Sequence, residues 1–196
     1  MSVLPIYNCF HPILKKKTEP VKEINQEVFD FVKNMYDTLY NISNGVGLAA
    51  NQAGKSLSIF IIDLRAEDSN EKPEPITFIN PEIIEFSDDE IDYQEGCLSV
   101  PDFFENVKRP SKIEVKYYDI NMKEHIREFD EFLARVIQHE YDHLDGILMY
   151  ERISALRRTL VKSKLNKIQK GDIFPNYPMI KADGSLYLPE LNADDD

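Results

Sequence analysis

The chain has 196 residues, of which 42% are hydrophobic, and its formal net charge is −12. This hydrophobic content supports one domain with a full core and excludes a wholly disordered chain. The acidic balance argues against general binding to nucleic acid or to an anionic membrane. No apolar run has the length of a membrane span, and the N-terminus lacks the pattern of a signal peptide, so we expect a cytoplasmic protein.

The first half of the chain is predicted to contain an extended arm, one helix and two strands. Three prolines interrupt residues 1–20, which favours an extended arm with turns. Apolar residues recur every three or four positions over residues 25–41, which predicts a helix with one buried face. Runs rich in β-branched and aromatic residues predict strands at 57–64 and 76–84. Charged residues and prolines between these strands predict an exposed loop at 67–75.

The second half is predicted to contain one strand and two helices. Apolar and polar residues alternate at 113–120, as in a half-buried strand. The helices are predicted at 131–144 and 154–170, and each is followed within two residues by a glycine. We assign residues 1–174 to a single domain and residues 175–196 to a partly flexible C-terminal tail.

The expected fold class is α+β, with antiparallel sheets around a central helix and a further helix near the C-terminus. The central helix carries His139, Glu140 and His143. Residues four apart share one face of a helix, so the two histidines can bind one transition-metal ion, with Glu140 placed to act on a nearby water. The alternative is a surface helix that carries two histidines by chance. The apolar face of the helix runs up to both histidines and favours their burial, where imidazoles need partners.

Cys97 is a candidate third ligand for the same metal ion. The chain has only two cysteines, Cys9 and Cys97, so there is no disulfide framework. Three protein ligands would leave one coordination position open, which is typical of a catalytic site. The alternative for Cys97 is a small buried hydrophobic residue, although its neighbours Gly96 and Ser99 contribute little to a core. Cys9 lacks such a context, and we expect it in the core or at the surface without a function.

Two further features allow two interpretations each. Gln52 closes an apolar, glycine-rich segment, so its amide either satisfies the local backbone or binds an oxyanion that develops during a reaction. Phe103 and Phe104 either form an apolar rim for downstream substrate residues or belong to the core.

Three segments resemble, in order and spacing, the signature motifs of the peptide deformylase family. They are GVGLAANQ at 45–52, EGCLS at 95–99 and QHEYDHLDG at 138–146. Residues 4–6 and 11–14 also resemble the N-terminal arm of that family, and the likeness covers about residues 3–170.

The resemblance implies a specific reaction and a role for each motif. The reaction is removal of the formyl group from the N-terminal formylmethionine of new polypeptides, with release of formate. The implied metal ligands are Cys97, His139 and His143, with water in the fourth position. Glu140 would act as general base and then as general acid, and the oxyanion hole would consist of the Gln52 amide and the backbone N–H of Leu98.

The family also guides the expected metal and substrate contacts. One divalent ion per chain is expected, and the family works with ferrous iron, while zinc, nickel or cobalt also suit sulfur and imidazole ligands. The substrate backbone is expected to pair with Val46 and Gly47 as an added strand. The methionine side chain would enter an apolar pocket near Val46, Tyr93, Phe132 and Val136. Arg135 is expected at its edge, with the stem lining the pocket and the charged head outside.

The helix predicted at 154–170 contains six lysines and arginines and no acidic residue. Its basic side chains either form a solvated face or dock on the ribosome, where the formylmethionyl nascent peptides emerge. We expect neither membrane binding nor sequence-specific recognition of nucleic acid.

Two other classes of protein share part of this pattern. A metallopeptidase would share the two histidines and the glutamate, but Cys97 and the segment that ends at Gln52 count against it. A non-catalytic binding module stabilised by a metal would keep the ligands, and in such a module replacement of Glu140 would have no effect.

Overall fold

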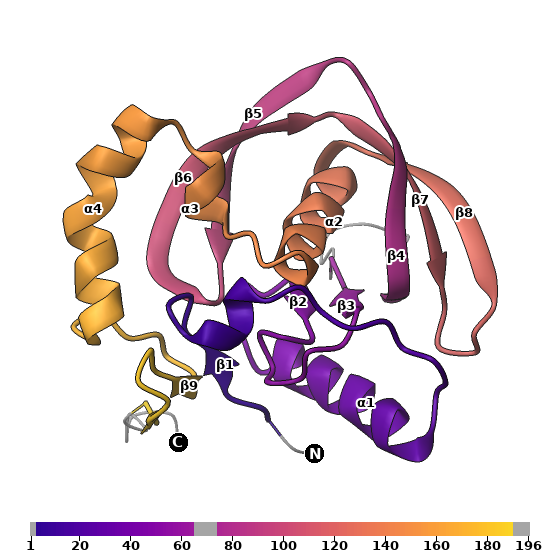
Figure 1. The fold of residues 1–196 in the computed structure, drawn as a ribbon, viewed down its shortest axis with the longest axis horizontal. Helices are drawn as coiled ribbons and strands as arrows, with labels where there is room; N and C mark the ends of the chain where they lie inside the picture. Colours follow the sequence, from indigo (N-terminus) through magenta and orange to yellow (C-terminus); the bar gives the residue numbers. More distant parts are fainter. Residues whose placement is uncertain (1–2, 65–73, 190–196) are drawn as a thin grey trace.

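The computed structural model describes residues 3–64 and 74–189. Most of the loop predicted at 67–75 and the end of the tail predicted from residue 175 therefore lie outside the described residues. Figure 1 shows the fold and its elements. In chain order these are β1 (Ile6–Tyr7), the 3-10 helix η1 (Pro12–Lys15), α1 (Gln26–Tyr40), β2 (Gly47–Ala49), β3 (Ile59–Ile62), β4 (Ile76–Phe86), β5 (Glu90–Cys97), β6 (Val100–Pro110), β7 (Lys112–Tyr118), β8 (Glu124–Asp130), α2 (Glu131–Leu144), α3 (Met149–Arg152), α4 (Ala155–Lys170), β9 (Met179–Ile180) and β10 (Leu186–Tyr187).

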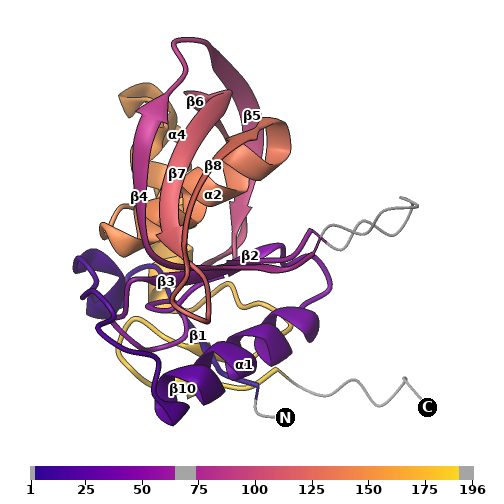
Figure 2. The same ribbon diagram turned by 90° about the vertical axis from the view of Figure 1, so that its right-hand side faces the viewer.

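The α+β fold expected from the sequence is confirmed. A five-stranded antiparallel sheet has the order β2-β3-β4-β7-β8, and β5 and β6 form a separate antiparallel pair. A third sheet, β1-β9-β10, joins the two ends of the chain, and in it β1 and β9 run parallel. Helix α2 lies between the β5–β6 pair and strands β4, β7 and β8, as Figures 1 and 2 show. It is therefore the central helix, and α4 is the expected C-terminal helix.

The side chains of strand β3 explain why helices α1 and α2 lie on opposite sides of the five-stranded sheet. Successive side chains of a strand point to opposite faces. Ile59 and Ile61 pack in one core cluster with α1, whereas Phe60 and Ile62 pack in a second cluster with α2. All four residues are buried, so the sheet carries an apolar layer on each face, and α2 packs on one of them.

Helix α2 ends at Leu144, two residues before Gly146, the glycine that predicted its end. Gly146 has φ of 73°, a left-handed conformation that favours glycine. A β-carbon there would lie 2.8 Å from the backbone carbon of Lys15. Because Gly146 has no side chain, the N-terminal arm can pass the C-terminal end of α2 in van der Waals contact.

The sequence analysis predicted only some of the strands. The predicted strands at 57–64, 76–84 and 113–120 correspond to β3, β4 and β7. Strands β5, β6 and β8 were not predicted. The side chains of β5 and β8 are mostly exposed and polar, and the prolines and charges of β6 conceal its alternation of buried and exposed residues.

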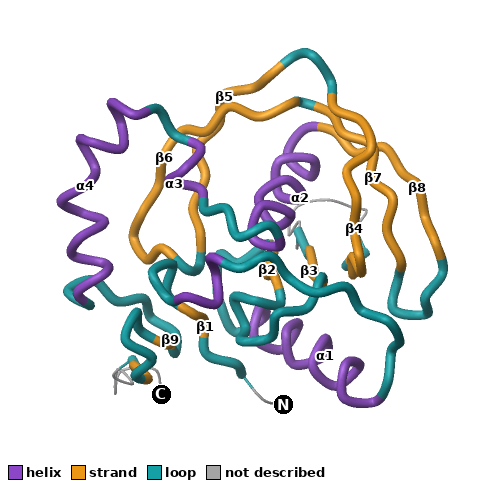
Figure 3. The backbone as a smooth tube through the Cα atoms, in the orientation of Figure 1, coloured by secondary structure: helices purple, strands orange, loops and turns teal. Residues whose placement is uncertain are grey.

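Residues 175–189, the described part of the predicted tail, return to the N-terminal arm. Figure 3 traces this segment from the end of α4 through loops to the short strands beside β1. The backbone N–H of Ile6 donates to the carbonyl of Pro178 at 2.9 Å, and that of Asn8 donates to Ile180 at 2.8 Å. Met179 is fully buried. Within the part of the chain that the structure covers, no helix is long and apolar enough to cross a membrane.

Candidate active site

Helix α2 places His139, Glu140 and His143 together inside the protein. The two imidazole rings have centroids 5.1 Å apart. His143 is 1% exposed, Glu140 5% and His139 8%. A surface helix with two chance histidines is therefore excluded.

Cys97 reaches the same point from the end of β5. Cys97 pairs with Val100 of β6, and Leu98 and Ser99 form the tight turn between them. The Cys97 Sγ lies 3.3 Å from the Nε2 atom of His143. One ligand atom from each of Cys97, His139 and His143 lies within 4.8 Å of the others. The thiol is therefore part of a three-ligand cluster.

The polar groups around this cluster suit one divalent metal ion. His139 Nδ1 lies 2.9 Å from the Glu95 carboxylate, which leaves its Nε2 for a metal, the usual arrangement of a metal-ligating histidine. Burial, and then the charge of His139, lower the pKa of His143, so this imidazole stays neutral and keeps the lone pair that ligation needs. A thiolate and two imidazoles form a donor set that fits zinc, iron, nickel or cobalt.

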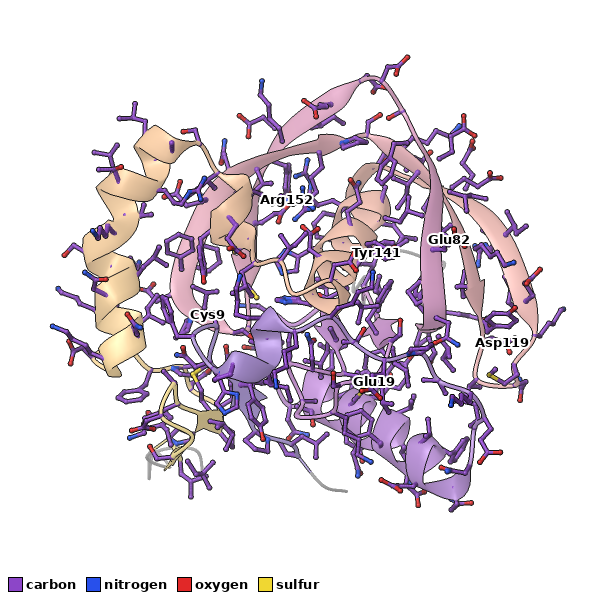
Figure 4. All side chains as sticks on the ribbon, in the orientation of Figure 1. Cys9, Glu19, Glu82, Asp119, Tyr141 and Arg152 are labelled. Carbon is purple, nitrogen blue, oxygen red and sulfur yellow. The ribbon has the colours of Figure 1, made fainter. Side chains whose placement is uncertain are left out.

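A network of buried charged side chains supports the helix and the strand that carry the three candidate metal ligands. Arg109 of β6 donates to Glu95 Oε1 at 2.7 Å and to Asp142 Oδ2 at 2.8 Å. Asp142 lies on α2 and also binds Arg152 of α3, which Figure 4 labels. Burial would raise the pKa of Glu95, but hydrogen bonds from His139 and Arg109 outweigh it and keep the pKa well below its usual range. The carboxylate is thus charged when it orients His139.

The expectation for Arg135 is wrong in one respect. Arg135 lines the cavity, but its charged head is buried instead of lying outside. The guanidinium donates to Glu95 Oε1 at 2.8 Å and to the carbonyl oxygens of Val107 and Ile91. It reaches inward because a carboxylate and two strand carbonyls replace its hydration.

The side chain of Gln52 satisfies the local backbone, which is one of the two interpretations that the sequence left open. Its side-chain oxygen accepts the backbone N–H of Ala49 at 2.8 Å. This bond turns the amide nitrogen toward the turn after β5, where it lies 3.1 Å from Ser99 Oγ and 3.7 Å from Cys97 Sγ. Local backbone satisfaction therefore orients the donor toward the ligand cluster.

The Glu140 carboxylate lies close to Gly47 of β2. A β-carbon on Gly47 would lie 2.6 Å from Glu140 Oε1. The other carboxylate oxygen, Oε2, is buried and has no hydrogen-bond partner among the described residues. Burial raises the pKa of Glu140 to about 7, so the group can both take up and release a proton near neutral pH.

A cavity of about 400 Å³ opens beside these groups. Among the residues predicted to bind substrate, those that line it are Val46, Gly47, Phe132, Arg135 and Val136. Tyr93 does not line it; this side chain is half exposed, and its ring centroid lies 6.0 Å from that of Phe132.

The two phenylalanines after the second motif differ in their burial. Phe103 is buried in a core cluster, whereas Phe104 is 60% exposed, and both line the cavity. Cys9, which Figure 4 labels, is buried in the same cluster as Phe103.

The sequence analysis assigned no role to several residues that lie at the site. Arg109 is one of several charged residues in its strand. Asn51 lies in the first motif but was given no role; its side-chain amide is fully buried and donates to the carbonyl of His143 at 2.6 Å. Asn176 and Tyr177 line the cavity although they lie beyond the three motifs. Each contact joins positions far apart in the sequence, so spacing alone does not reveal it.

In chemical terms this is a centre for the metal-dependent hydrolysis of an amide. The model of the polypeptide deformylase family matches residues 3–159. The chain therefore belongs to the polypeptide deformylase family, and the resemblance of the three motifs is confirmed. Its activity is removal of the formyl group from N-terminal formylmethionine, which sets aside the metallopeptidase and the non-catalytic module.

Individual relatives support this membership over nearly the whole chain. The peptide deformylase of Cytophaga hutchinsonii is 42% identical over 179 residues, which cover 90% of this chain and 96% of the relative. That of Rickettsia akari is 42% identical over 172 residues, with 86% and 98% covered. The crystal structure of the peptide deformylase from Ehrlichia chaffeensis has a TM-score of 0.78 at 33% identity and covers 87% of this chain and 99% of that one.

Proposed function

We propose that this chain removes the formyl group with six groups in defined roles. The metal ligands are Cys97, His139 and His143, the proton carrier is Glu140, and the oxyanion donors are the Gln52 amide and the Leu98 N–H. The observation that carries this assignment is the buried Glu140 carboxylate, one oxygen of which has no hydrogen-bond partner in the described part of the chain. This carboxylate borders both the cavity and the ligand cluster.

The metal site is proposed to hold one Fe(II) ion. When bound, the ion acts as a Lewis acid that polarises the formyl carbonyl and makes water a stronger acid. The protein fixes the geometry of its ligands: Glu95 orients His139, and the tight turn at Leu98 and Ser99 presents Cys97. Zinc, nickel or cobalt fit the same ligands in purified protein.

Glu140 is proposed to move the proton twice. Its unpaired Oε2 accepts a proton from the attacking water and then returns that proton to the amine that leaves. A pKa near 7 suits both steps, because the group is neither too weak a base nor too weak an acid at neutral pH.

The Gln52 amide and the Leu98 N–H are proposed to stabilise negative charge on the carbonyl oxygen. Ala49 fixes the amide of Gln52 before substrate arrives, so no reorganisation is needed during the reaction. Leu98 lines the cavity directly beside Cys97.

The substrate backbone is proposed to add to β2 as a further strand. In the order of the large sheet, β2 is an edge strand that pairs only with β3 among the described strands. The residues of β2 are buried, but Gly47 lines the cavity. An unpaired strand edge accepts an extended peptide through main-chain hydrogen bonds. Val46, Phe132 and Val136 would then surround the methionine side chain, while Tyr93 supports Phe132 from outside the pocket.

Formate release from matched peptides tests this function. A formyl-Met tripeptide is expected to be hydrolysed. The same peptide with an acetyl group is expected to react at least about 100-fold more slowly, because the acetyl group carries a methyl where the formyl group has only hydrogen. A chelator should abolish turnover, and added Fe(II) should restore it under exclusion of oxygen. Equal rates for the two peptides would contradict the proposed pocket.

The exposed face of α4 is proposed to contact the ribosome. Arg157 and Lys164 already pair with Glu105 and Asp102 of β6. The exposed basic residues Arg158, Lys162 and Lys167 remain for an anionic partner, and Leu156 and Leu160 are 72% and 64% exposed on the same helix.

Charge reversal tests this contact. The triple variant Arg158→Glu, Lys162→Glu, Lys167→Glu is expected to reduce co-sedimentation with ribosomes at low salt, because attraction between exposed charges is strongest there. Its deformylation of a free tripeptide should equal that of the wild type. Unchanged co-sedimentation would refute the contact.

A further inference from the structure

Residues 171–189 lie beyond the segment that the family model matches, yet they pack beside the active site. The family model ends at residue 159. After α4 the chain turns at Gly171 and brings β9 alongside β1, as Figure 1 shows. Asn8 supports this return: its side-chain amide donates to the carbonyl of Ile168 at 3.5 Å and contacts the sulfur of Met179.

This return places Tyr177 against the turn that carries the second motif. The Tyr177 hydroxyl donates to the carbonyl oxygen of Leu98 at 2.8 Å. Both side chains pack on the same core cluster, and both line the active-site cavity. Burial raises the pKa of the Tyr177 hydroxyl, so it remains a donor over the whole range in which the enzyme works.

Three hydrogen bonds hold the two-residue turn from different parts of the chain. The backbone N–H of Cys9 donates to the carbonyl of Ser99 at 2.8 Å, and the Gln52 amide donates to Ser99 Oγ at 3.1 Å. The bond from Tyr177 is the one that fixes the carbonyl of Leu98. Because Leu98 follows Cys97 directly, rotation of this turn would move both the thiolate and the Leu98 N–H.

We infer that Tyr177 is a positioning residue for deformylation, which acts by fixing the Leu98–Ser99 turn, and that the C-terminal segment thereby completes the active site. The inference rests on the proposed roles of Cys97 and Leu98. Tyr177 acts through the orientation of the turn and exchanges no proton with the substrate. A small displacement of reacting groups slows catalysis strongly. The proposed pocket for the methionine side chain consists of other residues, namely Val46, Phe132 and Val136.

The test is Tyr177→Phe in the full-length, metal-loaded protein. The variant keeps the ring and its packing and removes only the hydroxyl. We expect kcat for a formyl-Met tripeptide to fall about tenfold while KM changes less than about twofold, because the change misaligns the transition state more than it weakens ground-state binding. Tyr187→Phe is the matched control: it removes a hydroxyl from the same segment, where the Tyr187 ring stacks on Phe174 and not on the turn.

Hydrogen exchange gives a second readout that does not depend on activity or on metal. In metal-free Tyr177→Phe, the amides of residues 97–100 are expected to exchange faster than in the wild type, while those of α2 are unchanged. Tyr187→Phe should leave residues 97–100 protected.

The two readouts separate this inference from the proposed roles. Wild-type kcat together with unchanged exchange in Tyr177→Phe would overturn the inference and leave the proposed function intact. A change of KM alone would also overturn it, because that result would make Tyr177 a binding residue. If the wild type released no formate, the proposed catalytic roles would fail, and faster exchange would still support Tyr177 as the residue that holds the turn.

Discussion

Replacement of Glu140 by alanine is expected to lower kcat by about 10³–10⁴-fold, the upper part of the range for general acid–base catalysis. Glu140 is the buried carboxylate whose Oε2 has no partner among the described residues, and it borders both the cavity and the ligand cluster. Without it, the attacking water has no base and the leaving amine has no acid. The effect should fall on kcat, because Glu140 is proposed to act only in the reaction.

The lower kcat of Glu140→Ala must be distinguished from the effect of lost metal or of unfolding. Metal content by elemental analysis and the melting temperature of Glu140→Ala should stay close to those of the wild type, since the carboxylate is not one of the three ligands. Glu128→Ala is the matched control, because this exposed glutamate forms only a surface pair with Lys112. Near-normal turnover by Glu140→Ala would refute the proposed mechanism.

Replacement of His143 by alanine is expected to lower metal affinity by more than about 100-fold, since loss of groups that merely support ligands already costs 10–100-fold. His143 is 1% exposed, and its Nε2 lies 3.3 Å from the Cys97 thiol. Two ligands would remain, too few to keep the ion against dialysis. Formate release should fall with the metal content.

Competition with a chromogenic chelator measures this affinity. His125→Ala is the control, because His125 lies on β8 and contacts Asp119 at 2.9 Å, outside the ligand cluster. The control should bind one equivalent of metal. If His143→Ala retained the wild-type affinity, the three-ligand centre would be wrong.

The parts of the site that the sequence revealed are those encoded by local spacing. His139 and His143 are one helical turn apart, so any helix at 131–144 must bring them together. Cys97 could be recognised because a glycine and a short polar turn surround it. The same locality explains why α1, α2 and α4 were predicted close to their observed bounds.

The parts that the sequence did not reveal depend on contacts between distant positions. The sequence analysis expected the stem of Arg135 to line the pocket and its charged head to lie outside. Its partner Glu95 lies 40 positions away, on a strand that was not predicted. Tyr177 lies 79 positions from the carbonyl that it binds, within a segment predicted only as a tail. Spacing carries no information about such pairs.

The most direct test of the metal centre is a titration of metal-free protein with Fe(II) under exclusion of oxygen, with formate release from a formyl-Met tripeptide recorded at each step. If Cys97, His139 and His143 together bind one ion, activity should rise in proportion to bound iron and stop rising at one equivalent per chain. Turnover in fully metal-free protein, or no turnover at one bound equivalent, would contradict this metal centre.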